Sequence, residues 1–201
     1  MKTDWAEQNL QVIRTLMERS TIYQRALGPI MWWIGGLATV SAAMGWWQAQ
    51  SDGYYGDRFF LHWTLTSVVA MGGAFGLARR QARKEGEAFW SPAARRVAQA
   101  LLPAVVVGLI VTGFLWKNGL YAHAPMVGLW AMLYGCAVHA AGFFAPRGLR
   151  ALGWVAIACG LGWWVWTTGH DVARSHVAMG AIFGGLHLGY AVYLTVIKRE
   201  P

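Results

Sequence analysis

Apolar residues dominate six stretches of the chain, each close to the length of about 20 residues that a helix needs to cross the hydrocarbon core of a bilayer. Aspartate, glutamate and lysine are absent from all six stretches. The pattern therefore predicts an all-α, polytopic membrane protein with six transmembrane helices. The predicted spans cover about 29–47, 59–78, 97–116, 125–145, 149–166 and 172–197. The last is longer than a crossing requires, so we expect it to tilt or to extend beyond the membrane.

The N-terminal segment follows a different pattern, because its apolar positions recur at the spacing of one helix face. Asp4 and Glu7 are placed as a capping pair at the start of this helix. The apolar stripe consists of Leu10, Ile13, Leu16 and Met17. We predict an amphipathic cytoplasmic helix over residues 1–24 that lies on the lipid headgroups, followed by a six-helix transmembrane domain over residues 25–201. The alternative is that the stripe docks a cytosolic partner protein.

The composition agrees with membrane residence. Hydrophobic residues make up 56% of the 201 residues and charged residues only 13%, about half of the charge that a soluble domain carries. This composition excludes a disordered chain and a coiled coil, and a soluble protein of this size could not bury thirteen tryptophans. Two cysteines exclude a disulfide scaffold.

The basic residues lie between the apolar stretches and sort to one side of the membrane. Fourteen lysines and arginines fall in the N-terminal segment, the second and fourth connections and the C-terminal tail, and three fall on the other side. This asymmetry follows the positive-inside rule, so we predict cytoplasmic N- and C-termini and a location in the cell inner membrane. The same placement accounts for the net charge of +8 without a nucleic-acid partner, and the lipid bilayer is the predicted partner.

Matching residues recur in alternate spans, which indicates an internal repeat. In or just before each even-numbered span, a histidine is followed nine residues later by a methionine that itself follows an alanine. These pairs are His62 and Met71, His123 and Met132, and His170 and Met179. We predict three tandem two-helix hairpins, at about 25–80, 97–146 and 148–198, which share one orientation and are related by an approximate three-fold axis along the membrane normal.

Small residues spaced four apart predict where the helices pack closely, because van der Waals contact holds helices together in lipid. The pairs with this spacing are Gly72/Gly76, Gly180/Gly184, Gly185/Gly189, Ala104/Gly108, Ala156/Gly160 and Ala158/Gly162. We interpret all of them as packing positions rather than as binding sites.

One basic or imidazole side chain per hairpin lies on the glycine-rich face of an even-numbered span, in its cytoplasmic half: Arg79, His139 and His187. Ionisable residues within a span are functional candidates by default. No carboxylate within the spans can pair with them, so three converging donors would suit an anionic or acceptor-rich ligand. The structural alternatives are that Arg79 reaches the headgroups and that the two histidines bond to backbone carbonyls.

Four histidines fall near the outer ends of the even-numbered spans: His62, His123, His170 and His176. Together with three aspartates on the same side, they are candidate ligands for Zn, Cu or Ni. If the three-fold repeat holds, His62, His123 and His170 form a ring around its axis. The spacing between His170 and His176 is not the i, i+4 spacing of a helical metal pair. The structural alternative is that these histidines form hydrogen bonds at the helix starts.

No motif identifies a bound cofactor or a reaction. A haem would need axial histidines on facing helices, for which His139 and His187 are the internal candidates, and no C-x-x-C-H attachment motif is present. Nucleotide-binding, zinc-protease and serine-hydrolase motifs are absent too. We therefore predict no catalytic residue, no enzyme activity and no cofactor, with haem or a transition metal as the alternative.

Three functional hypotheses follow. The first is an inner-membrane protein that binds or translocates a small solute along the bundle axis, which Arg79, His139 and His187 would line. The second is a membrane sensor or assembly partner that acts through the N-terminal helix and the basic loop at 79–96. The third is a haem- or metal-binding protein. An open polar axis would favour the first hypothesis, and hydrogen bonds of both histidines to their own neighbours would count against it.

Overall fold

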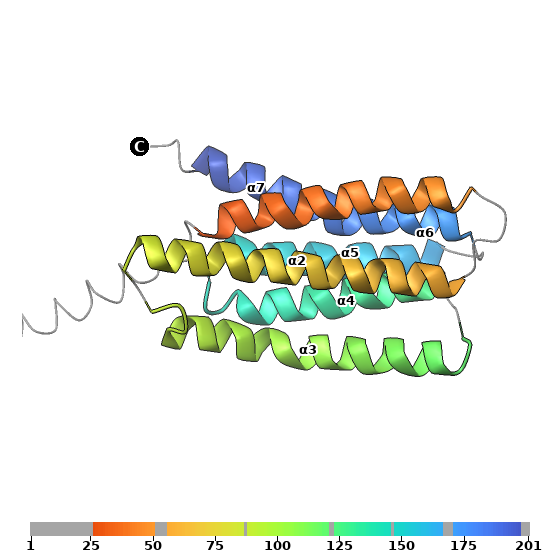
Figure 1. Ribbon diagram of the computed structural model, residues 1–201, viewed down its shortest axis with the longest axis horizontal. Helices are drawn as coiled ribbons and strands as arrows, with labels where there is room; N and C mark the ends of the chain where they lie inside the picture. Colours follow the sequence, from red (N-terminus) through yellow and green to blue (C-terminus); the bar gives the residue numbers. More distant parts are fainter. Residues whose placement is uncertain are drawn as a thin grey trace, which may run out of the picture.

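The computed structural model describes residues 26–50, 56–86, 88–120, 123–145, 147–166 and 171–197. The predicted amphipathic helix over residues 1–24 lies outside these ranges. The described residues form helices and their connections without strands, and six helices are long and apolar enough to cross a membrane (Figure 1). The predictions of an all-helical fold and of six helices that are long and apolar enough to span a membrane are therefore confirmed.

The spans follow one another along the chain with short connections. The first span is the helix Ala26–Gln48. The next four are α2 (Gly56–Lys84), α3 (Pro92–Lys117), α4 (His123–Ala141) and α5 (Arg147–Trp166). The sixth span consists of α6 (Val172–Met179), a π-helical turn η1 (Gly180–Gly185) and α7 (Leu186–Ile197). We call the end of the bundle where α2, α4 and α6 begin the histidine end. The opposite end, where α2 finishes and α3 and α5 begin, is the arginine end.

Two spans end away from their predicted positions. α2 continues past residue 78 to Lys84, because long basic side chains keep their charges at the headgroups while their stems cover apolar surface. Gly86 then turns the chain with a φ of 65°, in the left-handed region that glycine adopts without strain. α4 ends at Ala141, before the predicted residue 145, and Gly142 opens the turn that follows.

Side chains cap the starts of α3 and α6. The Ser91 hydroxyl oxygen accepts a hydrogen bond from the Ala94 amide at 3.3 Å, and Pro92 supplies the first residue of α3. Asp171 accepts from the Arg174 amide at 3.2 Å and also forms an ion pair with the Arg174 side chain. Each cap satisfies one of the amide groups that a helix start leaves without a partner.

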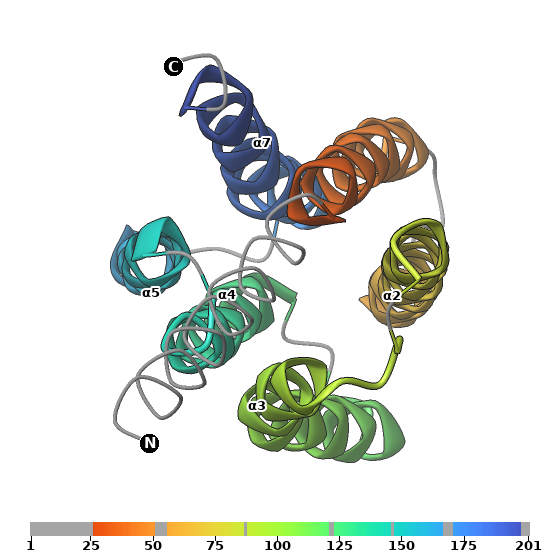
Figure 2. The same ribbon diagram turned by 90° about the vertical axis from the view of Figure 1, so that its left-hand side faces the viewer.

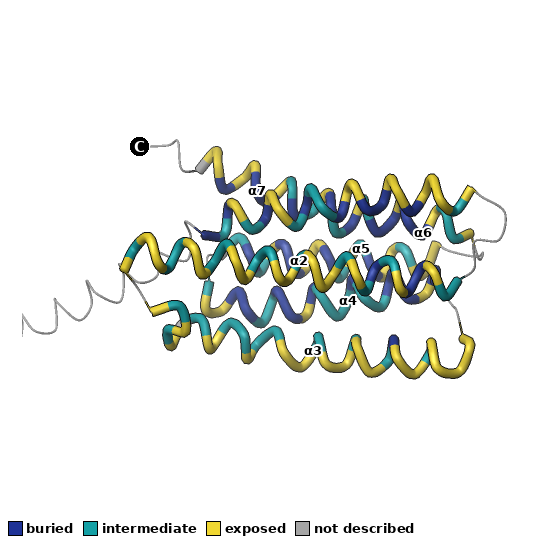
Figure 3. The backbone as a smooth tube through the Cα atoms, viewed as in Figure 1, coloured by how far each residue is buried: buried dark blue, intermediate teal, exposed yellow. Residues whose placement is uncertain are grey.

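The spans run side by side as a bundle, in which α4 is the most enclosed. Figure 2 looks onto the arginine end and shows α4 between α3 and α5, with the sixth span beside the first. α4 buries ten residues, whereas α3 is exposed along most of its length (Figure 3). Exposed residues of α3 such as Leu109, Ile110 and Phe114 are large and apolar, as expected of a surface in contact with lipid acyl chains.

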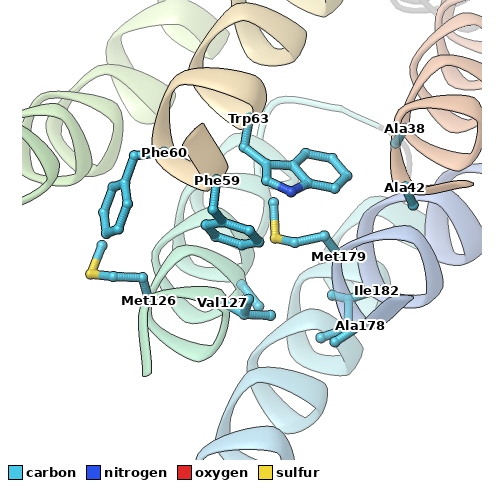
Figure 4. Packing of buried hydrophobic residues seen from close by; sticks show 11 residues of the cluster. Ala38, Ala42, Phe59, Phe60, Trp63, Met126, Val127, Ala178, Met179 and Ile182 are labelled. Atoms are coloured by element: carbon cyan, nitrogen blue, oxygen red, sulfur yellow. The ribbon is translucent and has the colours of Figure 1, made fainter. Parts of the chain in front are cut away.

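Aromatic and sulfur-containing side chains fill the bundle toward the histidine end. Phe59 and Phe60 are fully buried at the start of α2, and Trp63 follows one turn later (Figure 4). They belong to one cluster with Met126 of α4 and Met179 of α6. A second cluster consists of Met31, Val138, Leu149, Leu152, Tyr190, Ala191 and Leu194.

Glycines bring the backbones of α4 and α5 into contact. A Cβ atom at Gly135 would lie 2.6 Å from the Gly153 carbonyl oxygen, and one at Gly153 would lie 2.7 Å from the Gly135 carbonyl oxygen. In the same way, a Cβ atom at Gly128 would lie 2.8 Å from the Gly160 carbonyl oxygen, and one at Gly160 would lie 2.7 Å from the Gly128 carbonyl oxygen. Real Cβ atoms essentially never approach other atoms below 3.0 Å, so the two helices can pack this closely only with glycine at these positions.

The predicted packing pairs behave differently from one another. Gly180 and Gly184 lie against Ala42 and Thr39 of the first helix, so this pair is a packing position. Around the Cβ positions of Gly72 and Gly76 of α2, no atom of another described helix lies within 4 Å. The glycine face of α2 is therefore open rather than covered by another described helix.

The tandem hairpins are not evident in the packing. α4 packs most closely on α5, which the repeat assigns to the next hairpin. Met71 and Met179 hold matching places in the repeat, yet Met71 is 60% exposed and Met179 only 4%. Matching sequence positions thus occupy different environments.

Candidate functional site

Three imidazole rings gather at the histidine end, from His62 of α2, His123 of α4 and His176 of α6. The Phe59 ring lies among them, with its centroid 5.8 Å from that of His123 and 4.8 Å from that of His176. The centroids of His62 and His176 are 5.2 Å apart, and their rings are perpendicular. The structure therefore brings together three of the four predicted outer histidines. The fourth, His170, lies outside the described residues.

His176 is fully buried, in a space that a glycine of the first helix provides. A Cβ atom at Gly45 would overlap the imidazole ring. The Trp63 indole N–H donates a hydrogen bond to Nδ1 of His176 at 3.1 Å. His176 therefore contacts both the first helix and α2 from its place on α6.

His62 fixes α2 against the first helix. Its Nε2 lies 3.0 Å from the Ser41 carbonyl oxygen, so this nitrogen is the donor. One turn further along α2, the hydroxyl groups of Thr66 and Ser41 are hydrogen-bonded to each other at 3.0 Å. Hydrogen bonds of this kind hold helices together inside a bilayer.

These bonds determine which nitrogen carries the proton in two of the neutral rings. His176 accepts at Nδ1, so its proton is on Nε2, whereas His62 donates from Nε2. A metal ion on Nε2 of His176 would need the proton on Nδ1, where the Trp63 N–H already points. Among the described residues, no group of three or more His, Cys, Asp or Glu is placed to hold a metal ion. The geometry is that of hydrogen bonding between helices.

His187 forms a second buried centre, between α7 and α4. Its Nδ1 lies 2.5 Å from the Phe183 carbonyl oxygen and is therefore the donor, while Nε2 accepts from the Tyr134 hydroxyl at 2.6 Å. Phe183 belongs to the π-helical turn, where the regular hydrogen-bond ladder is interrupted. The Phe183 carbonyl oxygen accepts the Leu186 amide as well as the His187 side chain.

Two tyrosines provide a matched test of this bond. Tyr134→Phe removes the donor and leaves Nε2 of His187 buried without it, so we expect the free energy of unfolding to fall by about 1 kcal/mol. The buried hydroxyl of Tyr190 has no hydrogen-bond partner among the described residues, so Tyr190→Phe should be neutral or slightly stabilising. Denaturation by SDS in mixed micelles measures both variants. Equal losses would contradict the bond between Tyr134 and His187.

The three inner candidates are not brought together. Nδ1 of His139 lies 3.3 Å from the Arg150 carbonyl oxygen of α5, and its ring packs against Trp154. His187 is bonded within the sixth span and to α4, and Arg79 is exposed on α2. Both histidines therefore bond to their own neighbours, the arrangement that counts against a shared site on the bundle axis. The same contacts engage Nδ1 of His139 and both ring nitrogens of His187.

An open groove runs along α2 toward the arginine end. One depression of about 390 Å³ is lined by Gly76, Arg79, Arg80, Arg83 and Lys84. A second, of about 280 Å³, is lined by Trp33, Gly73, Gly76, Leu77 and Arg80. Gly76 and Arg80 line both depressions, so the two adjoin. We call them together the α2 groove.

The groove exists because two glycines lie on the same face of α2. Its α2 residues recur three or four positions apart, so they share that face. At Gly73, the absence of a Cβ atom lets the Trp33 indole of the first helix lie against α2, where its N–H donates to the Ala70 carbonyl at 3.2 Å. Gly76 leaves the space beside it open. Trp33 therefore lies at the side of the groove, and Gly76 lies at its base.

The groove is apolar at one end and cationic at the other. Among the described residues, no carboxylate lines either depression. Glu85, which follows α2 in sequence, accepts a hydrogen bond from Gln81 at 2.5 Å. Several cations beside an apolar helix surface attract anions more strongly than they would in bulk water.

The sequence predicts Arg79 as a candidate ligand-binding residue, but it does not predict the groove. The spacing of Gly73, Gly76 and the arginines is visible in the sequence, and it marks a helix face without bulky side chains. Trp33 gave no comparable signal, because nothing in the sequence indicates which span lies beside α2. Tyr134 was missed for the same reason, since its partner lies on another span.

The fold and the groove define a class of protein, the α-helical multi-pass membrane proteins, here with a cationic groove on one span. Comparisons with models of protein families, with curated proteins and with solved structures find no match for this chain. Its function is therefore inferred from its own residues.

Proposed function

We propose that this protein binds a small anionic ligand in the α2 groove, at the cytoplasmic face of the cell inner membrane. The observation that carries the proposal is the depression of about 390 Å³ that four cations line: Arg79, Arg80, Arg83 and Lys84. Guanidinium groups bind phosphate and carboxylate oxygens through paired N–H donors, and a volume of this order suits a small ligand. The ligand is thus an anion that bears a phosphate or a carboxylate.

The cytoplasmic side is supported by the distribution of charge along the sequence. Fourteen of the lysines and arginines fall in segments that the topology assigns to one side, and three fall on the other. α2 finishes at the end of the bundle where α3 begins with Arg95 and Arg96 (Figure 1). The groove would therefore open where cytosolic anions and the headgroups of the inner leaflet can both reach it.

Binding, rather than passage through the bundle, is the part of the solute hypothesis that the geometry favours. Arg79 lines the groove, whereas His139 and His187 are hydrogen-bonded to residues of neighbouring helices. Translocation along the axis stays a prediction. It would require both histidines to exchange these bonds for bonds to the solute.

Calorimetric titration of the purified full-length protein with phenyl phosphate, in a neutral detergent at low ionic strength, tests the proposal. We expect Arg79→Gln/Arg80→Gln to weaken binding by about tenfold or more, because two charged donors of the groove are lost. The matched control, Arg95→Gln/Arg96→Gln, removes the same charge from the start of α3, outside the groove. The affinity of this control variant for phenyl phosphate should change by less than about twofold. Equal weakening in the two variants, or no binding by the unaltered protein, would overturn the proposal.

A role as an assembly partner is the second candidate. The observation that favours it is the contact between Phe89 and Phe75, whose ring centroids are 4.6 Å apart, because it folds the basic connection back against α2. Trp90 beside it remains 54% exposed. The connection therefore presents an aromatic side chain near several cations, as a surface for a membrane or cytosolic partner would.

The tandem hairpins also remain a proposal. They are supported by the recurring spacing of histidine and methionine, and by the start of α2, α4 and α6 at one end of the bundle. The different environments of Met71 and Met179 mean that any common origin has been followed by divergence in packing.

A further inference from the structure

We propose that the ligand of the α2 groove is a membrane phospholipid with an anionic headgroup. Its phosphate would lie among the arginines, and part of one acyl chain would lie along Trp33 and Leu77. This inference rests on the proposed function and adds the chemical class of the ligand. The shared chemistry is a phosphate, which could also come from a soluble compound, and the experiment below distinguishes the two sources.

The apolar half of the groove favours an amphiphile over a soluble anion. Apart from Arg80, its lining consists of Trp33, Gly73, Gly76 and Leu77. The Trp33 N–H is engaged by the Ala70 carbonyl, so the polar atom of the indole is already bonded to α2. What remains for a ligand is apolar surface, which a soluble anion would leave uncovered and an acyl chain would cover.

The length of the groove matches a headgroup with part of a chain. Gly73 and Lys84 lie at its two limits, and the eleven helical steps between them rise by roughly 16 Å. Arg80 lines both depressions, so the charged and apolar parts of a ligand would meet beside one residue. Basic pockets beside transmembrane helices on the cytoplasmic side are the kind of site that anionic headgroups occupy.

The groove lies on a surface that lipids can reach from the side. Val68, Val69 and Met71 of α2 are all at least half exposed in the turns before it, as expected of residues that face acyl chains. A lipid could therefore enter laterally without leaving the bilayer. Arginines at a membrane surface attract anionic lipids even without a site, so the proposal requires that retention depend on the shape of the groove as well as on its charge.

Leucine substitutions at Gly76 and at Gly72 separate the effect of the shape of the groove from the effect of its charge. Both have open space around their Cβ positions, so a leucine at either position should be tolerated in the fold. Gly76 lines both depressions, whereas Gly72 lies one turn earlier and lines neither. Gly76→Leu would fill the groove, and Gly72→Leu adds the same apolar side chain beside it.

The experiment is native mass spectrometry of the full-length protein in neutral detergent, with equal amounts of dioleoyl phosphatidylglycerol and dioleoyl phosphatidylcholine. The two lipids have the same chains and differ in net charge. We expect one phosphatidylglycerol to be retained, in about tenfold or greater excess over phosphatidylcholine. Gly76→Leu should lower that retention about tenfold, and Gly72→Leu should change it by less than about twofold. If Gly76→Leu fails to fold, Leu77→Asn, which places a polar group in the apolar half, should cause the same loss.

Equal retention of the two lipids, or equal retention by Gly76→Leu and Gly72→Leu, would overturn the lipid proposal. If phenyl phosphate binding still depended on Arg79 and Arg80, the ligand would be a soluble anion and the proposed function would stand. If Gly76→Leu left the retention of phosphatidylglycerol unchanged and phenyl phosphate binding did not depend on these arginines, both proposals would fail.

Discussion

Gly135→Ala is expected to lower the free energy of unfolding by about 3 kcal/mol, a large effect for a single methyl group. The added carbon would lie 2.6 Å from the Gly153 carbonyl oxygen and 2.8 Å from the Ile157 amide nitrogen. Both are backbone atoms of α5, so no side chain can move aside to relieve the overlap. The two helices would have to separate, and in a membrane their association depends on this close contact.

Gly162→Ala on α5 is the matched control. No atom lies within 4 Å of its Cβ position, so the same substitution meets nothing. We expect its stability to be unchanged or to rise by up to about 1 kcal/mol, because alanine favours the helix over glycine. SDS denaturation in mixed micelles, followed by circular dichroism, measures both variants. If Gly135→Ala were as stable as Gly162→Ala, the described packing of α4 on α5 would be wrong.

Gly45→Ala is expected to lower the free energy of unfolding by about 2 kcal/mol, because its methyl group would overlap the imidazole of His176. That ring cannot easily shift, since it is fully buried, bonded to Trp63 and packed against Phe59. Gly36→Ala on the same helix is the control, because its Cβ position has open space. Its stability should stay within about 0.5 kcal/mol of the unaltered protein. SDS denaturation in mixed micelles, followed by circular dichroism, measures both variants.

A double variant identifies the cause of the stability loss expected in Gly45→Ala. His176→Ala removes the ring that the new methyl group would meet, so Gly45→Ala should cost little when added to His176→Ala. A full loss in the double variant would show that Gly45 is needed for another reason, and the proposed contact between the first helix and α6 would be contradicted.

The six spans can be predicted from the sequence because the thickness of the bilayer dictates their length, and the length of an apolar stretch can be counted. The neighbours of each span cannot be predicted in this way, since side chains that face lipid and side chains that face another helix are both apolar. Gly72/Gly76 and Gly180/Gly184 share one spacing, yet only the second pair packs against a described helix. The π-helical turn at Gly180–Gly185 is also invisible, because it changes the register of a helix without changing its hydropathy.

The same limit applies to the candidate sites: the sequence predicts the end of the bundle at which a residue lies, but not its neighbours on other helices. His62, His123 and His176 come together because each lies near the start of an even-numbered span, and topology alone places those starts at one end of the bundle. His139 and His187 lie seven and eight residues after matching methionines, and they face different neighbours, α5 in one case and Tyr134 in the other. Similar positions in a sequence repeat do not guarantee similar surroundings. The apolar end of the groove could not be predicted because Trp33, one of the residues that line it, comes from another helix.

Photolabelling with 4-azidophenyl phosphate tests most directly whether an anion binds among the arginines of α2. We predict that the label is found on the segment 73–84 of the unaltered protein, and that excess phenyl phosphate or Arg79→Gln/Arg80→Gln reduces it by about tenfold. Arg95→Gln/Arg96→Gln should leave the labelling of that segment unchanged. Label spread over all the basic segments in proportion to their charge, or label that excess phenyl phosphate does not displace, would contradict a binding site in the α2 groove.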